Sequence, residues 1–224
     1  MQVIIPTDWD LYWNLEGTEY VRANLVYTPY ISPDKRTLCM SFNRDVKYHK
    51  HEHENVLWTN ELLQDRFENE IKFHSIASKV MPTLKLQDVI PERREIYFEW
   101  HGDDFLMQGT DVLPGWQEQW IDRIETMWAN DVYKISLHPN SWTAHNGDLI
   151  PFNWFFCYHS NHSPITMRSL LIQISAGRQE KLEANGVDLD RLLTPKELQL
   201  VAFNSFRSNY PKELIETIIS KHEV

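Results

Sequence analysis

The order of hydrophobic patterns along the chain is the feature that most constrains its fold. Up to about residue 100, short runs of β-branched and aromatic residues between turn signals predict strands, interrupted by one helix-like segment. Beyond that point, apolar residues recur mostly at helical spacing. Strands followed by helices favour the α+β class. We therefore predict a strand-rich lobe with one long helix over 1–103, and a mostly helical lobe over 104–224 with a hairpin near 141–158.

Local signals set the expected elements. Strands are predicted over 19–30, 37–42, 84–89, 95–100 and 149–158, and helices over 60–77, 116–128, 164–182, from Pro195 and from Pro211. We expect Asn60 to cap the first helix and Pro82 to stop it, and Ser163 to cap the helix that follows it. Thr194 and Glu197 have the spacing of a capping box. Asn146-Gly147 predicts a tight hairpin turn.

Composition excludes several classes of function. The 224 residues carry 22 basic and 32 acidic side chains, a net charge of −10, which disfavours nucleic acid or an anionic membrane as the main partner. Only 7 residues are glycine, and neither GxGxxG nor GxxxxGK occurs, so the usual phosphate-binding loops are absent. We expect a protein partner instead. The sequence does not define an oligomeric state.

The two cysteines and the N-terminus indicate a reducing compartment. Cys39 and Cys157 both lie in apolar runs, which predicts buried free thiols rather than a disulfide or a nucleophile. No signal peptide is recognisable, and no run approaches the ~18–20 apolar residues of a membrane span. We therefore predict a cytoplasmic protein.

A histidine cluster offers one candidate metal site. His49, His51 and His53 would share one face of a strand and could hold Zn²⁺. A solvated, lysine-containing loop explains the same residues more simply, because nothing nearby is recognisable as a partner that orients the rings. We predict neither a metal ion nor a cofactor.

A second candidate lies at the hairpin. Asp148 is followed by Asn153, the spacing at which phosphotransferases place a hydroxyl-orienting Asp and a Mg²⁺-binding Asn. The simpler interpretation is that Asn146-Gly147-Asp148 forms the hairpin turn, and we prefer it. The nucleophile-elbow and HExxH motifs are both absent.

Several segments resemble the protein kinases and related small-molecule kinases. Phe67–Ile71 is similar to the helix whose glutamate, here Glu70, pairs with the phosphate-binding lysine. Ile96–Asp103 is similar to the strand and hinge beside the adenine. Ser136–Thr143 aligns without gaps on the catalytic-loop pattern D-L-K-P-E-N-I-L, and Leu149–Phe155 falls where the strand into Asp-Phe-Gly belongs. The resemblance implies a two-lobed fold with a nucleotide cleft.

The resemblance also implies that catalysis has been lost. The catalytic Asp position is Ser136, the Mg²⁺-binding Asn position is Ser141 (or Asn140 with one deletion), and the metal-binding Asp position is Asn153. The strand over 37–42 supplies no lysine. Hydroxyls and amides bind hard cations more weakly than carboxylates, and serine is a poor base near neutral pH. The positions left to line a nucleotide cleft are Glu70, Glu99, Trp100, His101, His138 and Asn140.

Three hypotheses follow. The favoured one is a degenerate kinase-like protein, a pseudokinase that binds a protein partner and has weak or no nucleotide binding. The second is an atypical ATP-dependent phosphotransferase that uses His138, Glu70, Asp103, Asp104 or Asp148. The third is an unrelated α+β interaction protein. The Trp-rich, Gly-poor composition also resembles kinase-like proteins of marine phages, which would imply the host cytoplasm.

Overall fold

The computed structural model describes residues 10–11, 26–43, 59–100, 113–168, 183–184, 186 and 188–222. Helices and strands are both present, and the pairings of the main sheet are antiparallel, as the expected α+β class requires. The chain divides into two compact units. The first comprises Met1–Glu68, Lys85–His101 and Thr166–Arg191, and the second comprises Asn69–Leu84, Gly102–Ile165 and Leu192–Val224. The boundary expected between residues 103 and 104 stays a prediction.

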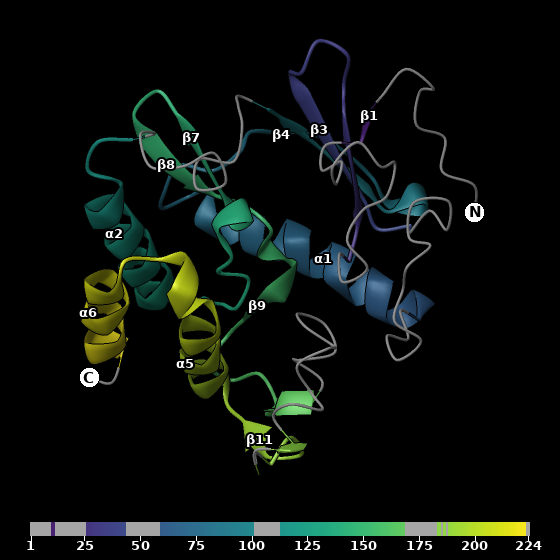
Figure 1. The fold of residues 1–224 in the computed structure, drawn as a ribbon. Coiled ribbons are helices and arrows are strands. Elements are labelled where there is room, and N and C mark those ends of the chain that lie inside the picture. The colour runs from purple at the N-terminus through teal and green to yellow at the C-terminus, as the bar shows by residue number, and fades with distance from the viewer. Residues whose placement is uncertain are drawn as a thin grey trace. The chain divides into compact units, whose positions relative to one another are not determined.

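The first unit contains a five-stranded antiparallel sheet (Figure 1). Its strands are β1 (Asp10–Leu11), β2 (Thr28–Ile31), β3 (Thr37–Ser41), β4 (Leu86–Ile90) and β5 (Glu95–Glu99), in the spatial order β1-β2-β3-β5-β4. In the turn between β2 and β3, the Ser32 hydroxyl accepts hydrogen bonds from the Arg36 and Thr37 N–H groups. A short 3₁₀ turn, η1 (Pro91–Arg93), joins β4 to β5.

The helix α1 (Asn60–Ala77) has the predicted bounds, but its ends are made differently. Thr59 is the capping residue, because its Oγ1 accepts a hydrogen bond from the Leu62 N–H at 3.2 Å. Asn60 is instead the first helical residue. The helix ends in a turn over 78–80, well before Pro82, so the expectation that this proline stops it was wrong. α1 contributes Asn60–Glu68 to the first unit and Asn69–Ala77 to the second.

The second unit is built from helices and short strands. After α1 come α2 (Trp116–Ala129), β6 (Tyr133–Lys134), η2 (Pro139–Ser141), β7 (Trp142–His145), β8 (Asp148–Pro151), η3 (Trp154–Phe156), β9 (Cys157–Tyr158), β10 (Ile165–Thr166), β11 (Leu192–Leu193), α5 (Pro195–Phe206), η5 (Arg207–Asn209) and α6 (Lys212–His222). β10 ends in the first unit, because Thr166 belongs there. Figure 1 shows α5 and α6 next to each other within this unit.

The hairpin β7–β8 forms at the predicted dipeptide. Asn146 and Gly147 both have positive φ, 52° and 87°, as a two-residue turn of type I′ requires. On the outer edge of β8, Gln119 of α2 donates from Nε2 to the Gly147 carbonyl and accepts from the Leu149 N–H. A helix side chain therefore occupies backbone groups that a further strand would otherwise use.

Two expected elements differ in the structure. The strand expected over 149–158 stops at Pro151, because Asn153 takes a left-handed conformation (φ 63°) and the chain continues as η3 before β9. The helix expected from Pro164, with Ser163 as its cap, does not begin there, because Ile165–Thr166 form β10. Met167 and Arg168 are helical, and residues 169–182 lie outside the described residues. The capping box of α5 is confirmed, with both Thr194–Glu197 bonds present.

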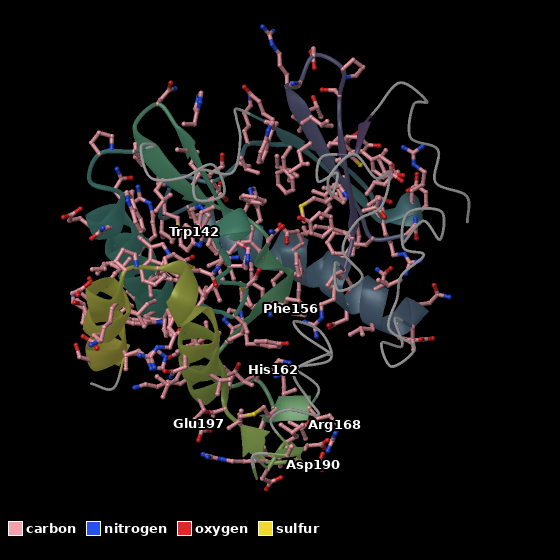
Figure 2. The ribbon with its side chains drawn as sticks, in the orientation of Figure 1. Trp142, Phe156, His162, Arg168, Asp190 and Glu197 are labelled. Carbon is pink, nitrogen blue, oxygen red and sulfur yellow. The ribbon has the colours of Figure 1, made fainter. Side chains whose placement is uncertain are left out.

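The core of the second unit is rich in tryptophan. Trp120, Trp142 and Trp154 are fully buried, and Trp120 packs against Trp142, Phe203 and Tyr210 at centroid distances of 5.1–6.0 Å. Figure 2 labels Trp142 among the side chains of this unit. Cys39 and Cys157 are buried free thiols, as expected. Burial raises the pKa of Cys39, so it is a poor nucleophile. Within the part of the chain that the structure describes, no helix is both long and apolar enough to cross a membrane.

Candidate functional site

Three residues that depart from the kinase pattern lie together in the second unit. They are Ser136, Ser141 and Asn153, which stand where the pattern has Asp, Asn and Asp. Ser136 follows β6, Ser141 ends η2, and Asn153 precedes η3. Ser136 Oγ and Ser141 Oγ share a hydrogen bond of 2.8 Å, and Asn153 Nδ2 donates to Ser141 Oγ at 3.3 Å. We call these three residues the Ser–Asn cluster. Its members are separated by 17 residues of sequence at most, so the intervening hairpin brings them together.

Backbone hydrogen bonds fix the centre of the Ser–Asn cluster. The Ser141 N–H donates to the His138 carbonyl at 2.8 Å, which closes the η2 turn. The Ser141 carbonyl accepts from the Phe152 N–H at 3.0 Å, which ties η2 to the end of β8. Ser141 and Asn153 are both buried, whereas Ser136 is half-buried. The cluster is therefore a built feature of the fold rather than a surface contact.

The chemistry open to the Ser–Asn cluster is limited. Its hydrogen-bonding groups are two hydroxyls and one carboxamide, and none of them is ionised near neutral pH. Two of the three bonds that a serine hydroxyl can form are already used at Ser141. Among the described residues, no group of His, Cys, Asp and Glu side chains is arranged to hold a metal ion. The cluster can hold the backbone of its segment in place. It supplies neither a general base nor a negatively charged ligand for a hard cation such as Mg²⁺.

Glu70 lies near this region on the second half of α1. Its side chain is fully buried, and Oε2 accepts a hydrogen bond from the Phe155 N–H at 2.8 Å. Burial raises the pKa of Glu70 to about 7, against the attraction of the Lys134 charge, which lowers it. The second oxygen, Oε1, is buried and makes no hydrogen bond among the described residues. The resemblance pairs Glu70 with a lysine, whereas in the structure Glu70 binds a backbone amide, and its place in a nucleotide cleft stays a prediction.

Lys134 is the residue that the sequence analysis missed. Its side chain is fully buried in β6, and Nζ donates to the Phe152 carbonyl at 2.7 Å and to the Asn153 carbonyl at 2.5 Å. Nζ also lies 5.0 Å from the centroid of the Trp154 ring. Burial lowers the pKa of Lys134 to about 8, and the negative forms of Cys157 and Glu70 oppose that shift. A lysine between apolar residues, Val132 and Ile135, was the available sequence signal.

The remaining cleft candidates are distributed between the units. Glu99 and Trp100 belong to the first unit, where Glu99 pairs with Lys85 at 3.1 Å and Trp100 is buried. His138 is half-buried, and its carbonyl closes the η2 turn. Asn140 lies within η2.

Other candidates of the sequence analysis lie outside the described residues, and their roles stay predictions. These are His101, Asp103, Asp104 and the histidine cluster His49, His51 and His53.

Asp148 is placed as the hairpin interpretation expects. It opens β8 directly after the turn, its side chain is exposed, and it lies 3.4 Å from the Arg123 guanidinium. Arg123 also donates to the Leu149 carbonyl. Both interactions attach the hairpin to α2. Asp148 is therefore engaged in a surface ion pair with Arg123.

Comparisons with known proteins give little further information. No family model matches the chain, and no curated protein does. Among solved structures, the chain is similar to the Rio2 kinase in its ADP/Mg²⁺-phosphoaspartate complex from Chaetomium thermophilum. The sequence identity is 11%, the TM-score is 0.42, and the match covers 88% of this chain and 67% of that chain. A likeness of this degree carries no argument about activity.

Proposed function

We propose that this protein is a degenerate kinase-like protein, a pseudokinase that acts by binding a protein partner and has weak or no affinity for nucleotide. The observation that carries the proposal is the Ser–Asn cluster: Ser136, Ser141 and Asn153 meet in one place, and they bind one another. The order of elements also supports it, since β2, β3, α1, β4, β5, α2 and a hairpin follow one another as the resemblance implies.

The chemistry of phosphoryl transfer explains why this cluster argues against catalysis. Transfer from ATP relies on a carboxylate that orients the acceptor hydroxyl and on carboxylate and amide oxygens that hold Mg²⁺. At the three aligned positions this chain offers two hydroxyls and one amide. None of these groups is anionic, so none gives Mg²⁺ the negatively charged ligand that it favours. The amide nitrogen and the two hydroxyls are also hydrogen-bonded within the cluster.

The atypical phosphotransferase is the weaker alternative, because two of its candidate groups are occupied. Glu70 accepts the Phe155 N–H, and Asp148 pairs with Arg123 at the hairpin. A net charge of −10 also supports a protein rather than nucleic acid as the partner. We infer a cytoplasmic location, which would be the host cytoplasm if a phage encodes the protein.

The proposal is tested by measuring thermal unfolding of the purified protein with and without Mg-ATP. We expect no shift in Tm at millimolar nucleotide, since a ligand that does not bind the folded state cannot stabilise it. A large, concentration-dependent rise with Mg-ATP, absent with ATP and a chelator, would overturn the proposal. The matched variant carries Ser136→Asp, Ser141→Asn and Asn153→Asp together. A Mg-dependent shift in this variant alone would support the assignment of the three positions.

Binding to a protein partner needs its own test. A partner recovered by affinity capture would be purified and titrated against this protein by calorimetry, without nucleotide. We expect saturable binding of defined stoichiometry that Mg-ATP does not change. Transfer of phosphate to the captured protein, lost in Asp148→Ala or Glu70→Ala, would instead select the phosphotransferase.

A further inference from the structure

Two buried side chains of opposite charge hold the four-residue segment Phe152–Phe155, which follows β8 and includes the first two residues of η3. Lys134 Nζ donates to the carbonyls of Phe152 and Asn153, and Glu70 Oε2 accepts from the N–H of Phe155. The cation therefore binds backbone acceptors and the anion binds a backbone donor, as the charges favour. Three backbone groups within four residues are satisfied in this way. Such a short irregular segment has few other partners for its buried backbone.

The two charges depend on each other although they do not touch. No direct ion pair joins Glu70 to Lys134 among the described contacts, yet each charge attracts the other through the protein interior. A lone charge in that environment would be unfavourable by several kcal/mol, and a compensating charge reduces this penalty. Each side chain is therefore the counter-ion of the other across the segment that both bind.

The backbone of Lys134 is held by elements other than the segment that its side chain binds. Lys134 pairs with Cys157 in the β6–β9 ladder, and its carbonyl accepts from Gln199 Nε2 of α5 at 2.9 Å. Gln199 Oε1 in turn accepts from the Trp128 indole of α2 at 2.6 Å. Both β9 and α5 thus hold the backbone of Lys134. Its ammonium group is therefore directed at Phe152–Phe155 by contacts that do not involve this segment.

We propose that Lys134 and Glu70 form a two-sided lock, with Lys134 as an internal cation, which keeps Phe152–Phe155 in one conformation without any bound ligand. The lock maintains the left-handed backbone of Asn153 and so keeps its amide on Ser141. This conformational role goes beyond the loss of nucleotide binding, and it would stand if that loss were disproved. The ionisable group that acts on Glu70 is Lys134, and those that act on Lys134 are Glu70 and Cys157.

The lock is tested by removing the internal cation and returning it from solution. Lys134→Ala deletes a propylammonium-sized group, so propylammonium should fill the cavity and restore the contacts, whereas 1-propanol matches its size without its charge. The readout is amide hydrogen exchange in the peptide that contains Phe152–Phe155. We expect exchange to accelerate at least ~10-fold in Lys134→Ala, since lost hydrogen bonds favour local opening. Propylammonium should slow it again in a saturable way.

Two variants control this result. Lys221→Ala removes a surface lysine that pairs with Glu125 on α2, and should leave exchange of the segment unchanged. Lys134→Ala combined with Glu70→Gln removes the counter-ion, so propylammonium should no longer slow the exchange. Unchanged exchange in Lys134→Ala, or equal rescue by propylammonium and propanol, would overturn the lock, because packing alone would then explain Lys134.

A second measurement serves if Lys134→Ala does not fold. Glu70→Gln retains an oxygen that can accept the Phe155 N–H but removes the negative charge. In the lock, this change lowers the pKa of Lys134 further, which NMR of ¹³C-labelled lysine side chains would follow as a pH titration. An unchanged lysine titration would show that the two charges are not coupled, and would overturn the proposal.

Discussion

The two units each bury a glutamate completely, and the two side chains are held in different ways. In the first unit, Glu95 of β5 lies 3.1 Å from the Arg93 guanidinium and accepts a hydrogen bond from the Tyr97 hydroxyl at 2.7 Å. Its partners are two residues away on either side. In the second unit, Glu70 binds the amide of Phe155, and its counter-charge is Lys134. Those partners are 85 and 64 positions further along the sequence.

This difference separates a local arrangement from a long-range one. Arg93, Glu95 and Tyr97 stabilise the turn and strand that already place them together, so their contacts add to an element that the β4–β5 ladder defines. Glu70 and Lys134 come from a helix and a strand, and they determine the course of a third segment that has no ladder of its own. Loss of one partner should therefore be tolerated better in the first unit than in the second.

The largest expected effect is the loss of stability in Lys134→Met. This change keeps the length of the side chain but leaves Glu70 without its counter-charge and two buried carbonyls without a donor. We expect the free energy of unfolding to fall by about 3–5 kcal/mol. Urea denaturation followed by tryptophan fluorescence would measure it. A loss below about 1 kcal/mol would mean that the buried lysine is not structurally important.

An intermediate effect is expected for the matched change in the first unit, Arg93→Met. One quarter of the Arg93 side chain is exposed (25%), and Tyr97 remains to bind the Glu95 carboxylate. We expect a loss of about 1–3 kcal/mol in the same denaturation experiment. If Arg93→Met proves as damaging as Lys134→Met, the contrast between the local and the long-range arrangement fails.

The second unit should also give stability an unusual dependence on pH. Burial raises the folded-state pKa of Glu70 from 4.5 to about 7. The stability that Glu70 contributes to the folded state is therefore complete below pH 4.5 and is lost as pH rises to about 7. Burial lowers the pKa of Lys134 from 10.5 to about 8, so its contribution is complete above pH 10.5 and is lost as pH falls to about 8. The pair thus contributes least between about pH 7 and 8.

The double variant Glu70→Gln/Lys134→Met isolates this contribution. The difference in unfolding free energy, wild type minus variant, should have a minimum between about pH 7 and 8 and rise on both sides. Chemical denaturation at several pH values from 5 to 10 (roughly the range that brackets both transitions) would give this curve. A difference that does not vary with pH would mean that neither group has a shifted pKa.

The smallest expected effect concerns the Ser–Asn cluster. Ser136→Ala removes a hydrogen bond to Ser141 from a half-buried hydroxyl, so we expect a loss of about 0.5–1.5 kcal/mol. Ser32→Ala in the β2–β3 turn is the matched change in the first unit, with two backbone N–H groups losing their acceptor. Stabilisation by Ser136→Ala would indicate that the cluster is strained rather than supportive.

Much of the local structure could be predicted from the sequence, because it rests on local rules. The bounds of α1, the capping box at Thr194, and the hairpin at Asn146-Gly147 each depend on a few neighbouring residues. The break after Pro151 could not be predicted in this way. Asn153 adopts its left-handed backbone within a segment held by Lys134 and Glu70, which are distant in sequence.

The same distinction applies to the candidate site. Alignment to a family pattern located Ser136, Ser141 and Asn153, and their hydrogen bonds follow from the hairpin between them. Lys134 was missed because a charged residue next to apolar neighbours in a strand ordinarily faces solvent, as alternation predicts. Only the tertiary structure shows that the face of β6 that carries Lys134 is covered, since this side chain is completely buried.

The primary amide of Gln119 has a consequence for self-association. Exposed strand edges invite pairing with other chains, and proteins commonly block them. By binding the Gly147 carbonyl and the Leu149 N–H, Gln119 occupies the edge of β8 with a group that cannot extend into a further strand. The β8 edge is thereby protected against edge-to-edge pairing, and a partner that recognises this edge would have to bind side chains rather than add a strand.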